Sequence, residues 1–451
     1  MSQAEFWSYF DPDLVLKGED VSQAYAKDWS ESVAHLPIAV LRPRTIEDLS
    51  LILTKATETE QKIVTQGGRT GLAGGATPKQ GEYALSTERL NKIIDIDPIG
   101  KTITVQAGVT LQQIQEKAAE FDLVFPLDLG ARGTATAGGI TSTNAGGNQV
   151  IQYGVTRHLI LGLTAVLPDG QIMKQENKLL KNNAGFDLKQ LMIGTEGTLG
   201  VVAEVTFRLF PRREFVKTAF CAAADFEAVK DLLFRAGKKL SGLSSFEVLW
   251  RDYMDEIIHV TGKPELFDKQ YDFYVLIEVE SSDDTDIFET AIMQAVDEGM
   301  IEDALLALNE THRLSFWNYR DAIADIIADI QPAINFDIGI PITEMDSFVT
   351  QIQKDLHEMF EGIRLVSFGH IGDGNLHFSA STGKQSDCVL IEDHVFKRAT
   401  AIGGTITAEH GIGVLKKDWL SDCRSEVEIE LMRRLKLLLD PAGILNAGRV
   451  I

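Results

Sequence analysis

The stretch Gln66–Gly75, QGGRTGLAGG, places five glycines in nine positions directly after a predicted strand over residues 61–66. Glycine is needed at this density where backbone N–H groups point inward together and the chain passes close to a ligand. Such a loop cradles a pyrophosphate without adding positive charge. It is neither the G-x-G-x-x-G dinucleotide motif nor a P-loop, which requires Lys followed by Ser or Thr. Taken alone, the stretch is also compatible with a flexible turn.

Two further glycine-rich strips make the turn interpretation hard to sustain. Residues 126–154 read PLDLGARGTATAGGITSTNAGGNQVIQYG and mix glycines with several threonines, while Gly194–Gly200 reads GTEGTLG. Hydroxyl groups and small residues at this density suit the wall of a large, planar ligand with polar edges. We therefore expect the three strips to line one ligand site in an α/β half of the chain.

Length and composition limit the class of protein. The chain has 451 residues, 44% of them hydrophobic and 24% charged, so we expect two or three globular domains. It has no apolar run of about 18 residues and no secretory signal, and its three cysteines are scattered, which predicts a cytoplasmic protein. A net charge of −23 argues against nucleic acid as a partner. An anionic substrate would need a local cation or metal to attract it.

The pattern of apolar residues predicts a domain boundary near residue 212. Residues 1–35 are polar and mildly helical, as in a leader that packs on the body. A β/α alternation follows, including an amphipathic helix that begins at Thr45 as its N-cap.

Beyond the boundary, strands and helices over 215–298 suggest a βαβ-type module, and residues 333–381 suggest a second copy. A long helical stretch over 302–329 separates them. A last helix is predicted to begin after Ser425 and to end at Asp440.

The segment Ser367–Ser379, SFGHIGDGNLHFS, sets two histidines symmetrically about an Asp-Gly turn. A two-residue hairpin turn at Asp373-Gly374 would pair His370 directly with His377 on one face of the sheet. That spacing suits two imidazoles on one divalent metal, with Glu409 as the third ligand and an open fourth position for catalysis. A glycine hairpin with two half-buried histidines is the competing interpretation, and the segment alone does not decide between them.

Together these motifs resemble the FAD-binding family of vanillyl-alcohol oxidase and p-cresol methylhydroxylase type. The resemblance extends over nearly the whole chain and is strongest to the branch that holds D-2-hydroxyglutarate and D-lactate dehydrogenases. It rests on seven ordered motifs: QGGRTGLAGG, PLDLGARGTATAGG, TNAGG, DLKQLMIGTEGTLG, GHIGDGNLH, TAEHGIG and DPAGILNAGRV.

The resemblance implies an α+β fold. It implies a two-subdomain FAD-binding domain over residues 1–212 and a cap domain over 213–415, with an antiparallel sheet and ferredoxin-like modules. It also implies that the C-terminal helical segment, residues 416–451, returns to the FAD domain.

The resemblance further implies which residues hold the cofactor. Arg69 stands where some relatives carry the histidine that bonds covalently to the flavin, so the FAD is expected to be non-covalent. The implied cofactor-binding residues are Gly67, Gly68, Arg69, Thr70, Gly71, Gly75, Pro126, Leu127, Gly130, Thr134, Gly138, Gly139, Thr143, Asn144, Glu196, Gly197 and Asn446.

By the same resemblance, His370, His377 and Glu409 bind Zn²⁺ or another divalent metal. His410 is the implied general base, because imidazole titrates near working pH. Arg320 matches the arginine that binds the substrate carboxylate; the alternative is a surface arginine paired with a neighbouring aspartate. The implied reaction is oxidation of a D-2-hydroxy acid to the 2-oxo acid, with hydride transfer to flavin N5 and metal assistance.

Three positions depart from the D-2-hydroxyglutarate pattern. Ala324, Asn335 and Ser379 stand where that branch has a threonine, a lysine and an asparagine that contact the substrate. Asn335 and Ser379 remain substrate-site candidates, but the loss of a cation weakens the case for a dicarboxylate. A D-lactate-like or glycolate-like acid is therefore an alternative to D-2-hydroxyglutarate.

Other classes of function were weighed against this one. They are oxidation of an alcohol that is not a 2-hydroxy acid, a metal-dependent hydrolase, and a non-catalytic nucleotide-binding protein. The sequence shows no nicotinamide motif, so the expected electron acceptor is an electron-transferring flavoprotein, a quinone or a cytochrome. For the oligomeric state, a homodimer is the default expectation.

Overall fold

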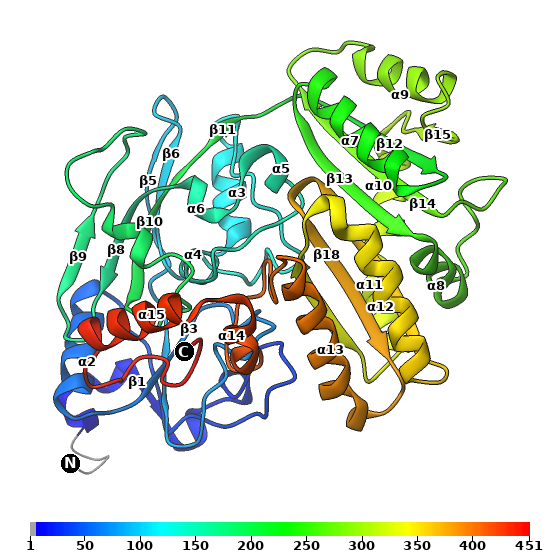
Figure 1. The fold of residues 1–451 in the computed structure, drawn as a ribbon. Helices are drawn as coiled ribbons and strands as arrows, with labels where there is room; N and C mark the ends of the chain where they lie inside the picture. Colours follow the sequence, from blue (N-terminus) through cyan, green and yellow to red (C-terminus); the bar gives the residue numbers. More distant parts are fainter. Residues whose placement is uncertain (1–5) are drawn as a thin grey trace. The chain divides into compact units, whose positions relative to one another are not determined.

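The computed structural model describes residues 6–451 and divides into two compact units (Figure 1). Unit 1 comprises Met1–Gly147, Tyr153–Arg212 and Glu409–Ile451, and unit 2 comprises Asn148–Gln152 and Arg213–Ala408. Among residues 6–451, no helix has both the length and the hydropathy that crossing a bilayer requires.

The first sheet of unit 1 has four strands in the order β1-β2-β4-β3, in which β2, β4 and β3 run parallel and β1 is antiparallel. Their bounds are Val15–Lys17, Ala39–Leu41, Tyr83–Ser86 and Ile63–Gln66. Helix α2, Ile46–Glu58, packs on this sheet through Leu49, Ile52, Leu53 and Ala56, which recur at helical spacing. Its predicted start is confirmed, because Thr45 forms a capping box with Asp48.

The second sheet of unit 1 is antiparallel, with five strands in the order β5-β6-β10-β8-β9. Their bounds are Ile93–Asp97, Thr102–Gln106, Val201–Arg208, Ile160–Val166 and Ile172–Gln175. Helices α3, Leu111–Ala119, and α4, Ala137–Thr143, contribute to the same apolar core. The remaining elements of the unit are β7 Leu123–Val124, β11 Phe210–Pro211, α6 Thr156–Leu159, α14 Leu420–Cys423 and α15 Glu426–Leu439, which begins after Ser425 as predicted.

Unit 2 is built on one antiparallel sheet of seven strands, in the order β15-β12-β14-β13-β17-β18-β16 (Figure 1). Their bounds are Asp303–Leu306, Phe215–Ala223, Phe273–Ser281, Leu243–Trp250, Arg364–His370, Asn375–Ser381 and Ile334–Gly339. The helices of the unit are α7 Phe226–Lys239, α8 Arg251–Thr261, α9 Ile287–Asp297, α10 Glu310–Arg320, α11 Ile323–Asp329, α12 Met345–Met359 and α13 Cys388–Ala401. Helix α5, Val150–Tyr153, lies where the chain returns from unit 2 to unit 1.

Two local predictions are wrong. The stretch 302–329 is not one helix, because Asp303–Leu306 pairs with β12 as an edge strand before α10 begins. The hairpin turn has four residues rather than two: Ile371–Asp373 form a 3₁₀ turn and Gly374 follows with φ of +81°. His370 therefore pairs with Asn375, and His377 pairs with Phe368.

The chain returns to unit 1 at Glu409, earlier than the predicted end of the cap domain at residue 415. Local hydrogen bonds account for this position. Ile412 N and Gly413 N donate to the Glu196 carboxylate at 2.7 and 2.9 Å, and Val414 N donates to Ala73 O at 2.9 Å. The backbone that follows Ala408 is thus held by residues of unit 1.

Asp252 on α8 is half-buried, and its carboxylate contacts residues of α12 and β17. Its Oδ2 accepts hydrogen bonds from Ser367 Oγ and Gln353 Nε2, both at 2.8 Å. Burial raises the pKa of Asp252 to about 7, although these hydrogen bonds act in the opposite direction. The folded protein therefore keeps a proton on Asp252 in a pH range where an unfolded chain releases it, since the ordinary pKa of Asp is about 3.9.

This proton makes stability depend on pH. Asp252 contributes most at acidic pH, and the contribution is lost as pH rises toward 7. We expect the melting temperature of Asp252→Asn to fall less than that of the wild type between about pH 5 and pH 8, measured by differential scanning fluorimetry. Asp231→Asn, at an exposed position on α7, is the control and should follow the wild type. Parallel profiles for Asp252→Asn and the wild type would contradict the assignment.

Candidate functional site

A cavity of about 400 Å³ lies within unit 1, and all three glycine-rich strips contribute to its wall. Thirteen of the predicted cofactor-binding residues line it: Gly67, Gly68, Arg69, Thr70, Gly71, Gly75, Gly130, Gly138, Gly139, Thr143, Glu196, Gly197 and Asn446. Glu409 and His410 line the same cavity. Its volume falls in the range of small-molecule and cofactor sites.

Backbone contacts explain why the first strip requires glycine. A Cβ atom on Gly67 would lie 2.5 Å from Thr136 Oγ1, and one on Gly68 would fall on the backbone of Thr134. Any side chain at these two positions would push the loop away from the start of α4. Glycine at these two positions therefore lets the loop lie directly against the start of α4 at the cavity wall.

Four predicted residues lie outside the cavity lining and have structural contacts instead. Pro126 and Leu127 are buried, and Leu127 O accepts a hydrogen bond from Gln115 Nε2 at 2.7 Å. Asn144 ends α4 with φ of +52°, and its Oδ1 accepts from Arg157 N at 2.9 Å. Thr134 supplies the backbone on which Gly68 packs.

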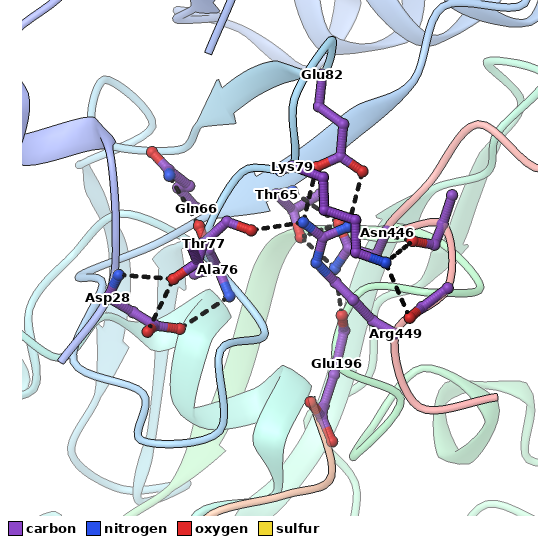
Figure 2. Close-up of polar contacts among 12 residues, drawn as sticks. Asp28, Thr65, Gln66, Ala76, Thr77, Lys79, Glu82, Glu196, Asn446 and Arg449 are labelled. Carbon is purple, nitrogen blue, oxygen red and sulfur yellow. Dashed lines mark hydrogen bonds and ion pairs between the residues drawn. The ribbon is translucent and has the colours of Figure 1, made fainter. Parts of the chain in front are cut away.

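Glu196 fixes the segment that carries Glu409 and His410. Its carboxylate accepts the N–H groups of Ile412 and Gly413, and its own carbonyl accepts a hydrogen bond from Asn446 Nδ2 (Figure 2). Burial raises the pKa of Glu196, and the two N–H donors act against that shift. One side chain thereby links the third glycine strip to the backbone just beyond His410.

The C-terminal residues close the same region of unit 1. Asn446 Oδ1 accepts a hydrogen bond from Thr65 N at 2.8 Å. The fully buried Arg449 forms an ion pair with Glu82 at 2.7 Å and donates to Thr77 O at 2.6 Å (Figure 2). These contacts fasten the end of the chain to the strands and loop that surround the first glycine strip.

No pattern in the sequence indicates Asp28, the aspartate that supports this strip. Asp28 is 2% exposed, and its carboxylate accepts hydrogen bonds from Thr77 Oγ1 and Ala76 N at 3.0 and 3.1 Å (Figure 2). Asp28 and Trp29 both line the cavity. They were missed because they belong to a polar leader with no periodic pattern.

The two predicted metal-binding histidines meet on one face of the sheet of unit 2. Their ring centroids are 5.1 Å apart and the ring planes are at 83°. His370 is directly opposite Glu247 on β13 and Asn375 on β18, whereas His377 is opposite Phe368 and Asp337 in the next row. Directly opposed residues of antiparallel strands point to the same side, so these side chains share one face.

A buried carboxylate holds His370 and Arg320 together. Glu247 is 1% exposed; its Oε1 accepts His370 Nδ1–H at 2.6 Å, and its Oε2 accepts Arg320 Nε–H at 3.0 Å. Burial alone would raise the pKa of Glu247, but His370 and Arg320 lower it to about 2. The sequence could have indicated Glu247, since it is the one charged residue in a strand whose eight residues are all buried.

The contact with Arg320 also indicates which ring nitrogen of His370 carries the proton. Arg320 Nη2 lies 3.1 Å from His370 Nε2, and a guanidinium can only donate. Nε2 is therefore the acceptor and Nδ1 carries the proton that bonds to Glu247. This tautomer directs the His370 Nε2 lone pair to the same face as His377, which is the orientation that a metal-binding histidine requires.

The two altered substrate-site candidates also lie on this face. Asn335 on β16 is directly opposite Ser379 on β18, and Ser379 Oγ donates to Asn335 Oδ1 at 2.8 Å. Each is two residues along its strand from the row of His377 and Asp337. Ala324 is exposed on α11.

Comparisons with known proteins cover both units. A family model for the FAD binding domain matches residues 37–175, and one for the C-terminal domain of FAD linked oxidases matches residues 212–450. The chain is 36% identical to D-2-hydroxyglutarate dehydrogenase of Xanthomonas citri pv. viticola, over 97% of this chain and 94% of that protein. It is 33% identical to mitochondrial D-2-hydroxyglutarate dehydrogenase of Rattus norvegicus, over 98% and 83%.

Solved structures share the fold at low sequence identity. The structure of p-cresol methylhydroxylase with substrate bound matches with a TM-score of 0.81 and 16% identity, over 99% of this chain and 95% of that chain. Alkyldihydroxyacetonephosphate synthase matches with a TM-score of 0.75 and 17% identity, over 99% and 85%. The predicted fold class is confirmed.

The contacts of Glu247 predict a large effect on stability. Glu247→Gln leaves the Arg320 guanidinium buried without its anion, and breaking a buried pair in this way costs about 3–5 kcal/mol. Glu298→Gln is the matched control, because Glu298 pairs with Arg235 in the same unit but is 56% exposed. That change should cost at most about 1 kcal/mol. Urea unfolding followed by intrinsic fluorescence measures both, and equal losses would contradict the role assigned to Glu247.

Proposed function

The chain belongs to the FAD-linked oxidase family, and we therefore propose that it is an FAD-dependent dehydrogenase that oxidises a D-2-hydroxy acid to the 2-oxo acid. Membership confirms the resemblance stated from the sequence motifs. One observation carries the proposal. Glu409 and His410, predicted as metal ligand and base, line the same cavity as the three glycine strips.

The cavity of unit 1 suits FAD. Glycines from all three strips line its wall, and close contacts at Gly67 and Gly68 leave no room for a side chain at these positions. Backbone N–H groups at such a surface bind a pyrophosphate without a cation. When bound, FAD supplies the acceptor for the hydride that leaves C2 of the substrate. Arg69, whose guanidinium lies 4.8 Å from the Tyr25 ring centre, is not a residue for covalent attachment.

One face of the unit 2 sheet carries Glu247, His370, Asn375 and His377 and is called the histidine face. This face suits a divalent metal. His370 has the tautomer of a metal ligand, and Glu247 is the carboxylate that commonly orients such an imidazole. We propose that His370 and His377 bind Zn²⁺ or another divalent ion with Glu409, which follows the last residue of unit 2 directly. When bound, the ion supplies a Lewis acid that lowers the pKa of the substrate hydroxyl.

The remaining residues have roles in binding and proton transfer. His410 is proposed to accept the hydroxyl proton, and the Glu196 carboxylate holds the backbone just after it in place. Arg320 is proposed to bind the substrate carboxylate. Its Nη2 now donates to His370 Nε2, and a metal on that nitrogen would exclude this hydrogen bond and leave Nη2 available for a carboxylate.

Two observations bear on the identity of the acid, and they favour different substrates. The relatives at 36% and 33% identity are named D-2-hydroxyglutarate dehydrogenases, which favours D-2-hydroxyglutarate. The Asn335–Ser379 pair is neutral and its two side chains bond to each other, which favours an acid without a second carboxylate, such as D-lactate or glycolate.

A panel of D- and L-2-hydroxy acids decides the function. We expect the purified protein to show the visible absorption bands of oxidised flavin, after reconstitution with FAD if necessary. The D-acids should bleach these bands and reduce an artificial dye that replaces the electron-transferring flavoprotein, quinone or cytochrome. L-acids of the same chain length should react at least about 100-fold more slowly. A protein that never binds flavin, or that no 2-hydroxy acid reduces, would overturn the proposal.

Variants of the metal ligands test the second cofactor. We expect His370→Ala and Glu409→Ala each to lower turnover by at least about 100-fold, because the Lewis acid contributes several kcal/mol to the barrier. Flavin absorbance should be unchanged in both, and bound metal measured by atomic emission should be lost. His259→Ala, at an exposed position on α8, is the control. Full activity in either ligand variant would exclude the metal role.

A further inference from the structure

Asn375 occupies a place on the histidine face that the proposed mechanism does not use. It is the first residue of β18 and lies directly opposite His370 on β17. On its other side, its partner on β16 is Gly339, which has no side chain to cover the amide. The Asn375 side chain therefore stands in the row of Glu247 and His370, next to the His370 imidazole.

The amide of Asn375 is buried without protein hydrogen bonds. The residue is 4% exposed, and neither Oδ1 nor Nδ2 has a hydrogen-bond partner among residues 6–451. Burying such a group without a partner is unfavourable relative to a satisfied amide. Most buried polar side chains have at least one partner, so two unmatched atoms on one residue need an explanation. The face on which they lie suggests a ligand.

We propose that Asn375 is a substrate-binding residue whose Nδ2–H group donates to a carboxylate oxygen of the bound 2-hydroxy acid. This inference rests on the proposed function and adds a residue to its substrate site. An acid offers acceptors, and the amide offers two N–H donors beside the proposed metal ligand His370. A neutral donor also suits this position, because a lysine there would be repelled by a divalent cation on His370.

A purely structural role predicts different behaviour on substitution. An amide that served the fold would have protein partners, and its replacement would break them. Since Asn375 has none among the described residues, a leucine of similar shape should be neutral or stabilising for folding. A substrate contact would be lost in the same variant. Stability and substrate binding should therefore change independently.

The experiment compares Asn375→Leu and Asn375→Asp with the wild-type holoenzyme. Substrate binding is measured from KM with the dye acceptor, and stability from the melting temperature. We expect KM to rise about 10- to 100-fold in Asn375→Leu, as for a lost hydrogen bond to a charged group, with a melting temperature equal to or above the wild type. Asn375→Asp keeps the shape but replaces the donor with an anion, so its KM should rise further. Flavin absorbance should be unchanged in both.

Thr102→Val is the matched control, because the Thr102 hydroxyl on β6 is also buried without a partner among residues 6–451. It should leave both KM and melting temperature near the wild type. An unchanged KM in either Asn375 variant would overturn the inference, and so would a melting temperature that falls in Asn375→Leu. A wild-type protein that no 2-hydroxy acid reduces would instead overturn the proposed function, so the two failures are distinguishable.

Discussion

The charge balance around Glu247 sets the chemistry of the whole histidine face. A carboxylate that is 1% exposed is tolerated only because His370 and Arg320 bond to its two oxygens. The Glu247 carboxylate in turn favours the His370 tautomer with a proton on Nδ1, and it orients the Arg320 guanidinium. His370 and Arg320, the proposed substrate arginine, both depend on this one buried anion. A neutral residue at position 247 would leave a cation buried and an imidazole free to rotate.

The cavity of unit 1 must attract a negatively charged cofactor in a protein that is itself negatively charged. The chain has a net charge of −23, so a dinucleotide with two phosphates is repelled at long range. Backbone N–H groups of a glycine-rich loop can attract a phosphate locally, and Arg69 in the same loop adds a cation to the cavity lining. The loop at the end of the first glycine strip is held in position by Asp28, which also lines the cavity, and by Arg449.

The sequence predicted the composition of both sites better than their geometry. The hairpin register was wrong by two residues, yet His370 and His377 remained on one face because side chains alternate with a period of two. Glycine density located the three strips that line the cavity, whereas the thirteen predicted residues that line it, Asn446 among them, were implied individually by the family resemblance. Glu247 was not predicted, although it is the one charged residue of its strand. Asp28 was not predicted because it acts through partners distant in sequence, such as Thr77. Such contacts leave no local pattern of spacing or hydropathy.

The interleaving of the two units along the chain has a consequence for biosynthesis. Unit 2 ends at Ala408, so all of its residues are synthesised before the last segment of unit 1, Glu409–Ile451. Thr65 and Glu82 are synthesised early, whereas their partners Asn446 and Arg449 are synthesised only after unit 2. Unit 2 can therefore begin to fold during translation, whereas the contacts that Asn446 and Arg449 make around the cavity of unit 1 form only after these residues are made. The nascent chain carries residues 1–212 without these contacts while residues 213–445 are synthesised.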